Sequence, residues 1–585
     1  MAIKKAEIRT GAYYDSVVLM QLQRSLAGLP GVQDAGVVMG TEANKDILSQ
    51  TGLLAPEAQA AAADDLVIVV QADDSSTAEA ALGKVDGFLT QRRGGVEQDY
   101  LPKSLESAAQ MLPDAQWVLI SVPGRYAAGV ARQALRLGKH VFLYSDNVSV
   151  DDELSLKQMA AEKGLLVMGP DCGTAIVNGV GLGFANKVRR GPIGLVAASG
   201  TGLQQVSARI HQLGAGITHA LGTGGRDLSK AVGAVTAHQG LELLSRDPAT
   251  RVIVLISKPP SPRVAAGLLE AARSASKPVV VDFIGYCPPT RQVDNLHFAN
   301  TFDEAAALSV ALATTGDADL DKSLPGRPQA QEIPKGSELE QFAAGQQYLR
   351  GLFSGGTLAY EALLLLQDYV PAVYSNVPLE KEYRLANSLT SQAHTIVDLG
   401  EDEFTVGRLH PMMDNDLRIR RLEQEAEDPE VAVILLDVVL GYGAHPDPAS
   451  ELAPAIAQAC SSARKAGRHL AVMAIVVGTD EDPQDLSAQI EQLESAGAQV
   501  ETSNDLAVRR VGRLLRRLNP SPTLQQSASV DLAALQQPLA AINAGLESFA
   551  ESVVAQSAEA IQVDWRPPAA GNERLMAILE RMKGG

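Results

Sequence analysis

Apolar runs that end in glycine-containing turns recur along this chain and predict buried strands, each followed by a helix. One unit opens with an apolar strand at 193–198, a turn of Ser, Gly, Thr and Gly, and an apolar helix. A later unit opens with a similar turn before the apolar helix at 358–366. Both units continue with a second turn (222–227 and 398–402), an Asp-Pro turn before a buried strand, and a further strand. Because the four signals keep one order, we predict a duplicated βα unit.

The first turn of each unit is a candidate anion site. A helix N-terminus carries unpaired backbone N–H groups and a partial positive charge, which suit a phosphate or a carboxylate. Two such ends that face one another would form a cradle for a single anion. A Ser or Thr at a helix start also serves as an ordinary N-cap, and this alternative stays open. The candidate phosphate- or substrate-binding residues are Ser199, Gly200, Thr201, Gly202, Gly224, Gly225, Gly355, Gly356 and Thr357.

The same patterns divide the whole chain into five segments. Residues 1–93 predict a small α+β domain of ferredoxin-like type, and 105–185 alternate strand and helix as a doubly wound parallel sheet does. The duplicated units occupy 190–315 and 346–518, and 538–585 predict a C-terminal docking arm with a helix and a strand. The expected fold class is α/β: a Rossmann-like parallel sheet domain plus two flavodoxin-like domains, with an N-terminal α+β domain.

Composition excludes several classes of partner. The chain has 585 residues, of which 46% are hydrophobic and 20% charged, as expected of a globular chain with an ample core. Its formal net charge of −19 argues against nucleic acids and anionic membranes. Three scattered cysteines, with no CxxC and no HExxH motif, predict neither a disulfide framework nor a metal site. The first residues lack the apolar core of a signal peptide and no run approaches a membrane span, so we expect a cytoplasmic protein.

Five further side chains lie where strands end. Arg226 follows two glycines and could grip a phosphate or carboxylate, or form a surface salt bridge. Lys258 ends an apolar strand, where open α/β sheets bind ligands, or it only terminates that strand. His445 offers acid–base chemistry or stabilises its turn. Asp171 and Cys172 lie in another such loop, and a cysteine there is more often a small buried filler than a nucleophile. We take Arg226, Lys258 and His445 as catalytic candidates, and Asp171 and Cys172 as substrate-binding ones.

Longer motifs carry a family resemblance. The run GPDCGTAIVNG, followed by GPIGLVAASGTGLQQVSARI, resembles the site loop and second-domain opening of the succinyl-CoA synthetase α subunit, whose Ser-Gly-Thr helix holds phosphate. Residues 350–515 are similar to the carboxy-terminal domain of its β subunit. Across nearly the whole chain, the sequence resembles the FdrA family in the order of LMQLQRSLAGLPGV, MGTEANKDIL, GPDCGT, GGRDLS, ISKPP, GYGAHPDPA and VDWRPPA. The resemblance implies two domains of the succinyl-CoA synthetase type and a truncated CoA-binding-like Rossmann domain.

Three departures from the synthetase pattern limit what the resemblance implies. The glycine-rich strand-turn-helix that begins the synthetase CoA-binding domain is missing, which weakens the expectation of CoA binding. The Gly-His-Ala-Gly loop that relays phosphate is replaced at 285–289 by Gly-Tyr-Cys-Pro-Pro, so no phosphohistidine is expected. No ATP-grasp portion is present, so this polypeptide alone should not use ATP.

The FdrA resemblance implies a function as well as a fold. FdrA-like proteins are associated with oxamate carbamoyltransferase, in which oxalurate and phosphate give oxamate and carbamoyl phosphate, within allantoin and purine nitrogen metabolism. We therefore expect a subunit of a homo- or hetero-oligomeric carbamoyl or acyl transferase, with phosphate or carbamoyl phosphate as substrate and no tightly bound cofactor. The alternative is an acyl-CoA synthetase or acyl-CoA transferase component that works with an ATP-grasp partner. A third alternative is a non-catalytic scaffold that assembles partner chains.

Overall fold

The computed structural model describes residues 3–11, 16–50, 52–63, 65–90, 102–286, 288, 290–316, 341–405, 408–519 and 532–566. The chain forms two compact units, Met1–Asn519 and Pro520–Gly585, and each is described by itself. Cys287 and the end of the predicted arm at 567–585 lie outside the described residues. None of the described helices combines the length and the apolar character that crossing a membrane requires.

The first unit begins with the predicted small α+β domain. Its three-stranded antiparallel sheet has the order β1-β3-β2, and the central strand β3 is buried along almost its whole length because helices and a neighbouring loop cover it. Asp74 caps α3 by accepting a hydrogen bond from the Thr77 N–H. The elements are β1 (Ile3–Arg9), α1 (Ser16–Ala27), β2 (Val32–Met39), α2 (Glu42–Gln50), η1 (Pro56–Ala60), β3 (Leu66–Ala72), α3 (Ser75–Leu82) and α4 (Val85–Thr90).

The Rossmann-like segment is a three-stranded parallel sheet of order β4-β5-β6. Its elements are α5 (Leu105–Met111), β4 (Trp117–Ile120), α6 (Gly124–Arg136), β5 (His140–Leu143), α7 (Val150–Glu162) and β6 (Val167–Met168). The hairpin that follows, β7 (Thr174–Val177) and β8 (Val180–Gly183), pairs with the next sheet instead, where Ile176 lies opposite Ala220. The sheets therefore change before residue 185, the predicted end of this segment.

The first repeated half completes an eight-stranded sheet of order β13-β14-β12-β11-β9-β10-β7-β8. Its central strands β12, β11, β9 and β10 are parallel and mostly apolar, as expected of strands covered on both faces. The elements are β9 (Arg190–Ala198), α8 (Gly200–Gln212), β10 (Ile217–Gly222), α9 (Val235–Arg246), β11 (Val252–Ser257), α10 (Pro262–Arg273), β12 (Val279–Phe283), β13 (Gln292–Val293), β14 (Leu296–Phe298) and α11 (Phe302–Thr314).

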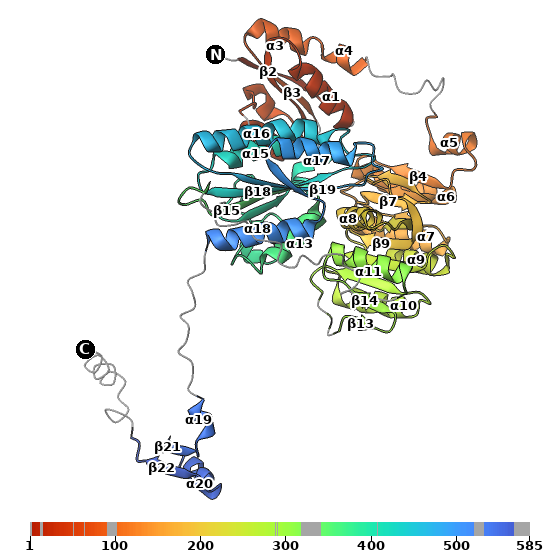
Figure 1. Ribbon diagram of the computed structural model, residues 1–585. Coiled ribbons are helices and arrows are strands. Elements are labelled where there is room, and N and C mark those ends of the chain that lie inside the picture. The colour runs from red at the N-terminus through yellow and green to blue at the C-terminus, as the bar shows by residue number, and fades with distance from the viewer. Residues whose placement is uncertain are drawn as a thin grey trace. The chain divides into compact units, whose positions relative to one another are not determined.

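The second repeated half is an all-parallel six-stranded sheet of order β16-β17-β15-β18-β19-β20. Helices α15, α16 and α17 cover one face, and α13 and α18 cover the other (Figure 1). The elements are β15 (Tyr348–Phe353), α13 (Gly356–Leu366), β16 (Tyr374–Ser375), η3 (Lys381–Tyr383), β17 (Thr395–Asp398), α14 (Asp402–Thr405), α15 (Asp416–Glu427), β18 (Val431–Val439), α16 (Pro448–Lys465), β19 (Ala471–Val477), α17 (Leu486–Ser495), β20 (Ala498–Glu501) and α18 (Asn504–Leu518). These parallel sheets and the N-terminal α+β domain confirm the predicted α/β class.

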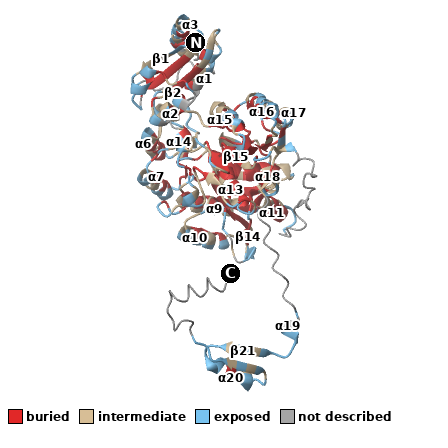
Figure 2. Cartoon of the chain, turned by 90° about the vertical axis from the view of Figure 1, so that its left-hand side faces the viewer, coloured by how far each residue is buried: buried red, intermediate tan, exposed pale blue. Residues whose placement is uncertain are grey.

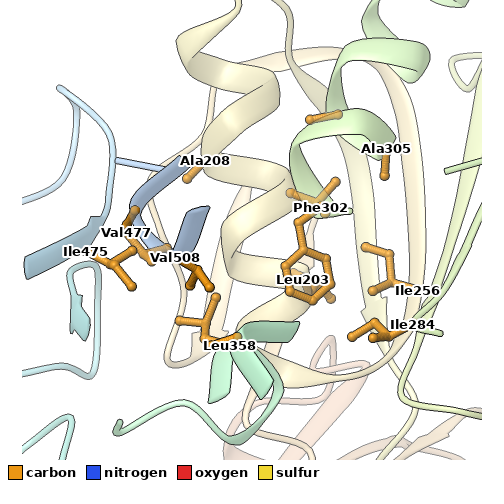
Figure 3. Close-up of a cluster of buried hydrophobic side chains, with 14 of the residues drawn as sticks. Leu203, Ala208, Ile256, Ile284, Phe302, Ala305, Leu358, Ile475, Val477 and Val508 are labelled. Carbon is orange, nitrogen blue, oxygen red and sulfur yellow. The ribbon is translucent and has the colours of Figure 1, made fainter. Parts of the chain in front are cut away.

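One hydrophobic core joins the two halves. Leu203 of α8, Phe302 of α11, Leu358 of α13 and Val508 of α18 belong to a single buried cluster (Figure 3). A hydrogen bond also joins the two halves. Glu361 of α13 accepts it from the Phe302 N–H of α11 (2.9 Å), and accepts a second one from Asn504 Nδ2 of α18 (2.7 Å). The two halves therefore behave as one packed body, in which α8 and α13 hold fixed positions.

The second unit is small. It contains α19 (Ala533–Gln536), then β21 (Ala540–Ala544), α20 (Glu547–Ala555) and β22 (Glu559–Val563), and its two strands pair in parallel. The predicted docking arm, expected to hold a helix and a strand, is thus a βαβ unit with an additional strand before the helix. Figure 2 shows that little of it is buried.

The shared core predicts a large stability effect at Phe302. Replacing Phe302, which has no exposed surface, with Ala removes packing from both halves and should lower the free energy of unfolding by about 3–5 kcal/mol. Val180→Ala, at a side chain that is 62% exposed, should change it by less than about 0.5 kcal/mol. Urea unfolding followed by circular dichroism measures both variants, and equal losses would contradict a shared core at Phe302.

Candidate functional site

The loops that follow the central strands of the two sheets converge on the N-termini of α8 and α13. Strand β9 leads into Ser199 and α8, and β15 leads into Ser354 and α13. Lys258 follows β11, and Asp398 ends β17. Carboxyl ends of parallel strands share one edge of a sheet, which is where α/β proteins bind ligands. The site is therefore built from strand ends of both halves.

The two helix ends touch. Ser199 Oγ donates a hydrogen bond to Thr357 Oγ1 (2.8 Å) and accepts one from the Gly202 N–H (3.0 Å). A Cβ atom on Gly355 would lie 2.7 Å from Thr201 Cγ2, closer than two carbon atoms tolerate. Glycine at 355 is thus what lets the two helix ends approach. The structure brings the candidate residues of the two turns together.

The N-terminus of α8 keeps free hydrogen-bond donors. Among the described residues, no partner is recorded for the N–H groups of Gly200 and Thr201. Thr174 Oγ1, from a side chain that is 1% exposed, also has no partner, and a Cβ on Gly200 would lie 3.6 Å from it. A buried hydroxyl without a hydrogen bond is costly unless a ligand or water meets it. These three donors form the core of the candidate anion site.

Two of the protein's own carboxylates lie beside the N-terminus of α13, although neither caps a helical N–H group. Asp437 accepts hydrogen bonds from the N–H groups of Ser354 (2.7 Å) and Gly355 (2.8 Å), and Arg418 Nη1 holds it at 2.9 Å. Asp398 Oδ2 lies against Gly356, at a place where any Cβ would collide with it. The predicted cradle is therefore asymmetric, because two carboxylates lie beside the start of α13, whereas the neutral Ser199 hydroxyl caps α8.

Lys258 lies between the carboxyls of Asp171 and Asp398. Its Nζ would be 3.4 Å from a Cβ on Gly356, and among the described residues no carboxylate pairs with it within 4.0 Å. Burial raises the pKa of Asp171 to about 7, with a further rise from Asp146, while the charge of Lys258 opposes it. Burial likewise raises the pKa of Asp398 to about 7, and Lys258 again opposes the rise. One lysine thus balances two carboxyls that titrate near neutral pH.

Asp171 keeps an exposed residue surface although neighbouring groups crowd its carboxyl, whereas Asp398 is buried. Asp171 occupies the left-handed region, with φ of 55°, and its Oδ2 would lie 3.3 Å from a Cβ on Gly225. Gly224, with φ of 89°, passes so close to the Pro170 carbonyl that a side chain there would collide with it. The two glycines thereby place their backbone beside the Asp171 carboxyl.

The other predicted side chains make different contacts. Arg226 pairs with Glu153 (3.0 Å) and donates to the Val148 carbonyl (2.7 Å), in a network with the fully buried Lys157 of α7. Cys172 is buried, which raises the pKa of its thiol to about 12, as fits a packing residue. Neither contact places Arg226 or Cys172 against the open end of α8.

His445 contacts the N-terminal domain. Its Nδ1 accepts a hydrogen bond from the Asp447 N–H (3.1 Å), so Nε2 carries the proton in the neutral ring. That Nε2 lies 3.2 Å from Glu451 Oε1, and Arg24 of α1 pairs with the same carboxylate at 2.7 Å. His445 therefore helps to hold the N-terminal domain against the second repeated half. Among the described residues it makes no hydrogen bond or ion pair with the two helix ends.

Sequence reasoning missed Thr174, Asp437 and Asp398 as site residues. Asp398 begins one of the recurring turns, and Thr174 ends the GPDCGT run, so a signal existed for both. Asp437 lies inside the buried strand β18, and no sequence pattern shows that its carboxylate reaches the start of α13. The missed residues are those that make the site asymmetric.

Comparison with known proteins finds similarities in the N-terminal domain, in the second repeated half and over most of the chain. The family model "CoA-ligase" matches 352–514, and "AllF, heavy metal-associated domain" matches 1–102. The uncharacterized protein YahF of Escherichia coli is 43% identical over 502 residues, which cover 86% of this chain and 96% of YahF. Subunit alpha 2 of an ADP-forming succinate–CoA ligase from Archaeoglobus fulgidus is 29% identical, over 35% of this chain and 72% of that protein.

Among solved structures, the dinucleotide-forming acetyl-coenzyme A synthetase 1 of Ca. Korarchaeum cryptofilum aligns with 70% of this chain and 85% of its own, with 16% identity and a TM-score of 0.29. The sequence similarities support the succinyl-CoA synthetase resemblance and the acid–thiol ligase alternative. They do not support carbamoyl transfer.

The domain that matches the heavy-metal-associated family lacks the usual ligands of a heavy metal. Residues 1–102 contain no Cys and no His, the side chains that soft metals prefer. Among the described residues, no three His, Cys, Asp or Glu side chains gather where they could hold a metal ion. The residues of this domain therefore do not fit a heavy metal.

The two carboxyls near neutral pKa predict pH-dependent anion binding. Below about pH 7 Asp171 and Asp398 become protonated, so they no longer repel an anion at the start of α8. Sulfate stays a dianion across this range, and we expect it to bind roughly tenfold more tightly at about pH 5.5 than at about pH 8.5. Isothermal titration calorimetry measures the ratio. Asp171→Asn should flatten the profile, and Glu242→Gln on the exposed face of α9 should leave it unchanged; a flat wild-type profile would count against the site.

Proposed function

Since this chain belongs to the same family as the Escherichia coli protein YahF and carries a CoA-ligase domain, we propose that it is the acyl-transfer component of an acid–thiol ligase. In this proposal it moves an acyl group between phosphate and the thiol of CoA. The observation that carries the proposal is the open end of α8, where the Gly200 and Thr201 N–H groups and the Thr174 hydroxyl lie free of partners near Lys258. Such a set suits the phosphate of an acyl phosphate.

The chemistry needs no protein nucleophile. The thiol sulfur attacks the acyl carbon, a C–S bond forms, the C–O bond to phosphate breaks, and phosphate leaves with the electron pair. The thiol proton goes to a base, and Asp171 keeps an exposed residue surface and titrates near neutral pH. Lys258 stabilises the charge on the departing phosphate. In this proposal the start of α8 binds the phosphate, Lys258 stabilises its charge and Asp171 accepts the thiol proton.

Acyl-CoA chemistry ranks ahead of carbamoyl transfer for this chain. The anion site would accept carbamoyl phosphate equally well, because its donors contact phosphate and do not select the acyl group. The similarities, however, lie with CoA ligases over both the α-subunit-like region and 352–514. The Archaeoglobus relative is a subunit of a succinate–CoA ligase, so a small carboxylic acid is the substrate class we propose here.

A partner chain would supply the nucleotide. The synthetase-type phosphate relay through a histidine loop is absent at 285–289, and no ATP-grasp portion is present in the sequence. We propose that a separate ATP-grasp subunit makes or consumes the acyl phosphate and that this chain performs the transfer to the thiol.

Phosphate binding tests the anion half of the proposal. Lys258→Met keeps the length of the side chain and removes its charge, so we expect inorganic phosphate to bind roughly 10- to 100-fold more weakly, because a charged hydrogen bond contributes about 1.5–3 kcal/mol. Gly200→Val covers the start of α8 and should abolish binding. Lys230→Met, at an exposed lysine after the same group of loops, is the matched control. Thermal shift and calorimetry report binding, and unchanged affinity in Lys258→Met would remove Lys258 from the site.

A CoA titration separates the two activities. We expect CoA to bind the full chain, more tightly with phosphate present, and oxalurate with phosphate to give no carbamoyl phosphate. If CoA does not bind while oxalurate is cleaved in a phosphate-dependent way, carbamoyl transfer replaces acyl-CoA chemistry as the function of this site.

A further inference from the structure

The second unit exposes its more apolar face. Strands β21 and β22 alternate exposed and half-buried residues, and α20 packs on the half-buried side. That side carries Asn543 and Gln562, whose side chains hydrogen-bond to each other. The opposite face of the sheet carries Ile542 (79% exposed) and Ile561 (70%), and Trp565 (60%) follows the end of β22. A sheet normally buries its apolar face, but here α20 covers the more polar face and leaves the apolar face exposed.

The described part of this unit cannot be stable by itself. Among its described residues only Ala550 is a buried hydrophobic residue (Figure 2). Parallel sheets occur with both faces covered, and a two-stranded sheet is at best marginal in water. Segments shorter than about 40 residues need a crosslink, a metal or an oligomer to fold, and the described part has no Cys. The open face is therefore the surface through which the described part can gain the core that it lacks.

We propose that the same unit of a second copy of the chain covers this open face. The open face, formed by Ala540, Ile542, Ala544, Ile561 and Val563, carries one charged strand residue, Glu559 at its edge, and Trp565 follows β22. Two such faces can pack as a sandwich about 10 Å apart. A two-fold axis makes each residue of the patch meet the same patch on its partner.

The area agrees with a stable dimer. At roughly 100–150 Å² for each large exposed side chain and less for the alanines, the open face offers about 600 Å² per copy. Two copies bury about 1,200 Å², the lower limit for specific protein–protein interfaces. The unit would gain in the dimer the core that it lacks alone.

Charge selects the direction of the two sheets. Glu559 begins β22, and Arg566 follows its end, where it is 82% exposed and pairs with Asp564. A two-fold axis across the strands reverses them and brings Glu559 of one copy to Arg566 of the other. An axis along the strands would place like charges together. The dimer is therefore antiparallel in its facing strands.

Sedimentation of the full chain tests the interface. We expect wild type to sediment at twice the 61.6 kDa chain mass. Ile561→Asp places a charge in the packed face of both copies and should weaken association at least about 100-fold. Ser552→Asp adds the same charge on the exposed side of α20 and should leave the dimer intact. A wild-type monomer, or a dimer that Ile561→Asp does not weaken, overturns the proposal.

A charge exchange gives a test that does not depend on folding of the Asp variant. Glu559→Arg alone and Arg566→Glu alone should each weaken the dimer about 3- to 10-fold, and the double variant should restore wild-type association. Restoration supports the antiparallel arrangement. Weakening by both single variants without restoration, or no effect of either, rejects that arrangement.

Discussion

The packing of α8 and α13 in one apolar core is the constraint on which the candidate site depends. Their own sequences make both helices good candidates for anion binding, but an isolated helix end contributes only about 0.3–2 kcal/mol toward an anion. Contacts among Leu203, Phe302 and Leu358 hold the two ends together, and Glu361 ties α13 to α11 and α18. Because interiors are close-packed, the distance between the ends cannot relax freely. The site is therefore a property of the interface between the halves.

The charged groups beside the two helix ends differ. At α13, Asp437 accepts hydrogen bonds from the Ser354 and Gly355 N–H groups just before the helix, and Arg418 pairs with this carboxylate. At α8 the neutral Ser199 hydroxyl caps the helix, and among the described residues the N–H groups of Gly200 and Thr201 have no hydrogen-bond partner. A symmetric cradle would hold an anion more tightly, but it would also hold the leaving phosphate more tightly. Under the proposed function, one open end with one lysine would give the moderate binding that suits a transfer reaction with product release.

Much of the fold could be predicted from the sequence, because periodicity and glycine turns are local signals. The strands before Ser199 and Lys258, the small N-terminal domain and the order of the repeated units follow from them. Contacts made through space could not be predicted. The pairing of β7 with β10, the reach of Asp437 to Ser354 and the docking of Arg24 near His445 join residues far apart in the chain. Arg226 had the right position for a ligand contact, but nothing local reveals that Glu153 and Val148 engage it.

The two carboxylates that sequence reasoning missed, Asp398 and Asp437, were missed for the same physical reason. A carboxylate is usually placed on the surface in a sequence-based prediction, because burying it alone is costly. Asp398 and Asp437 are buried only because a lysine, an arginine and backbone N–H groups surround them, and these groups come from both halves of the repeat. Their burial raises both pKa values and makes the charge of the site sensitive to pH near neutrality for Asp398. A duplicated fold can create such a place even when neither copy carries it alone, since Lys258 of the first half faces Asp398, which the second half buries.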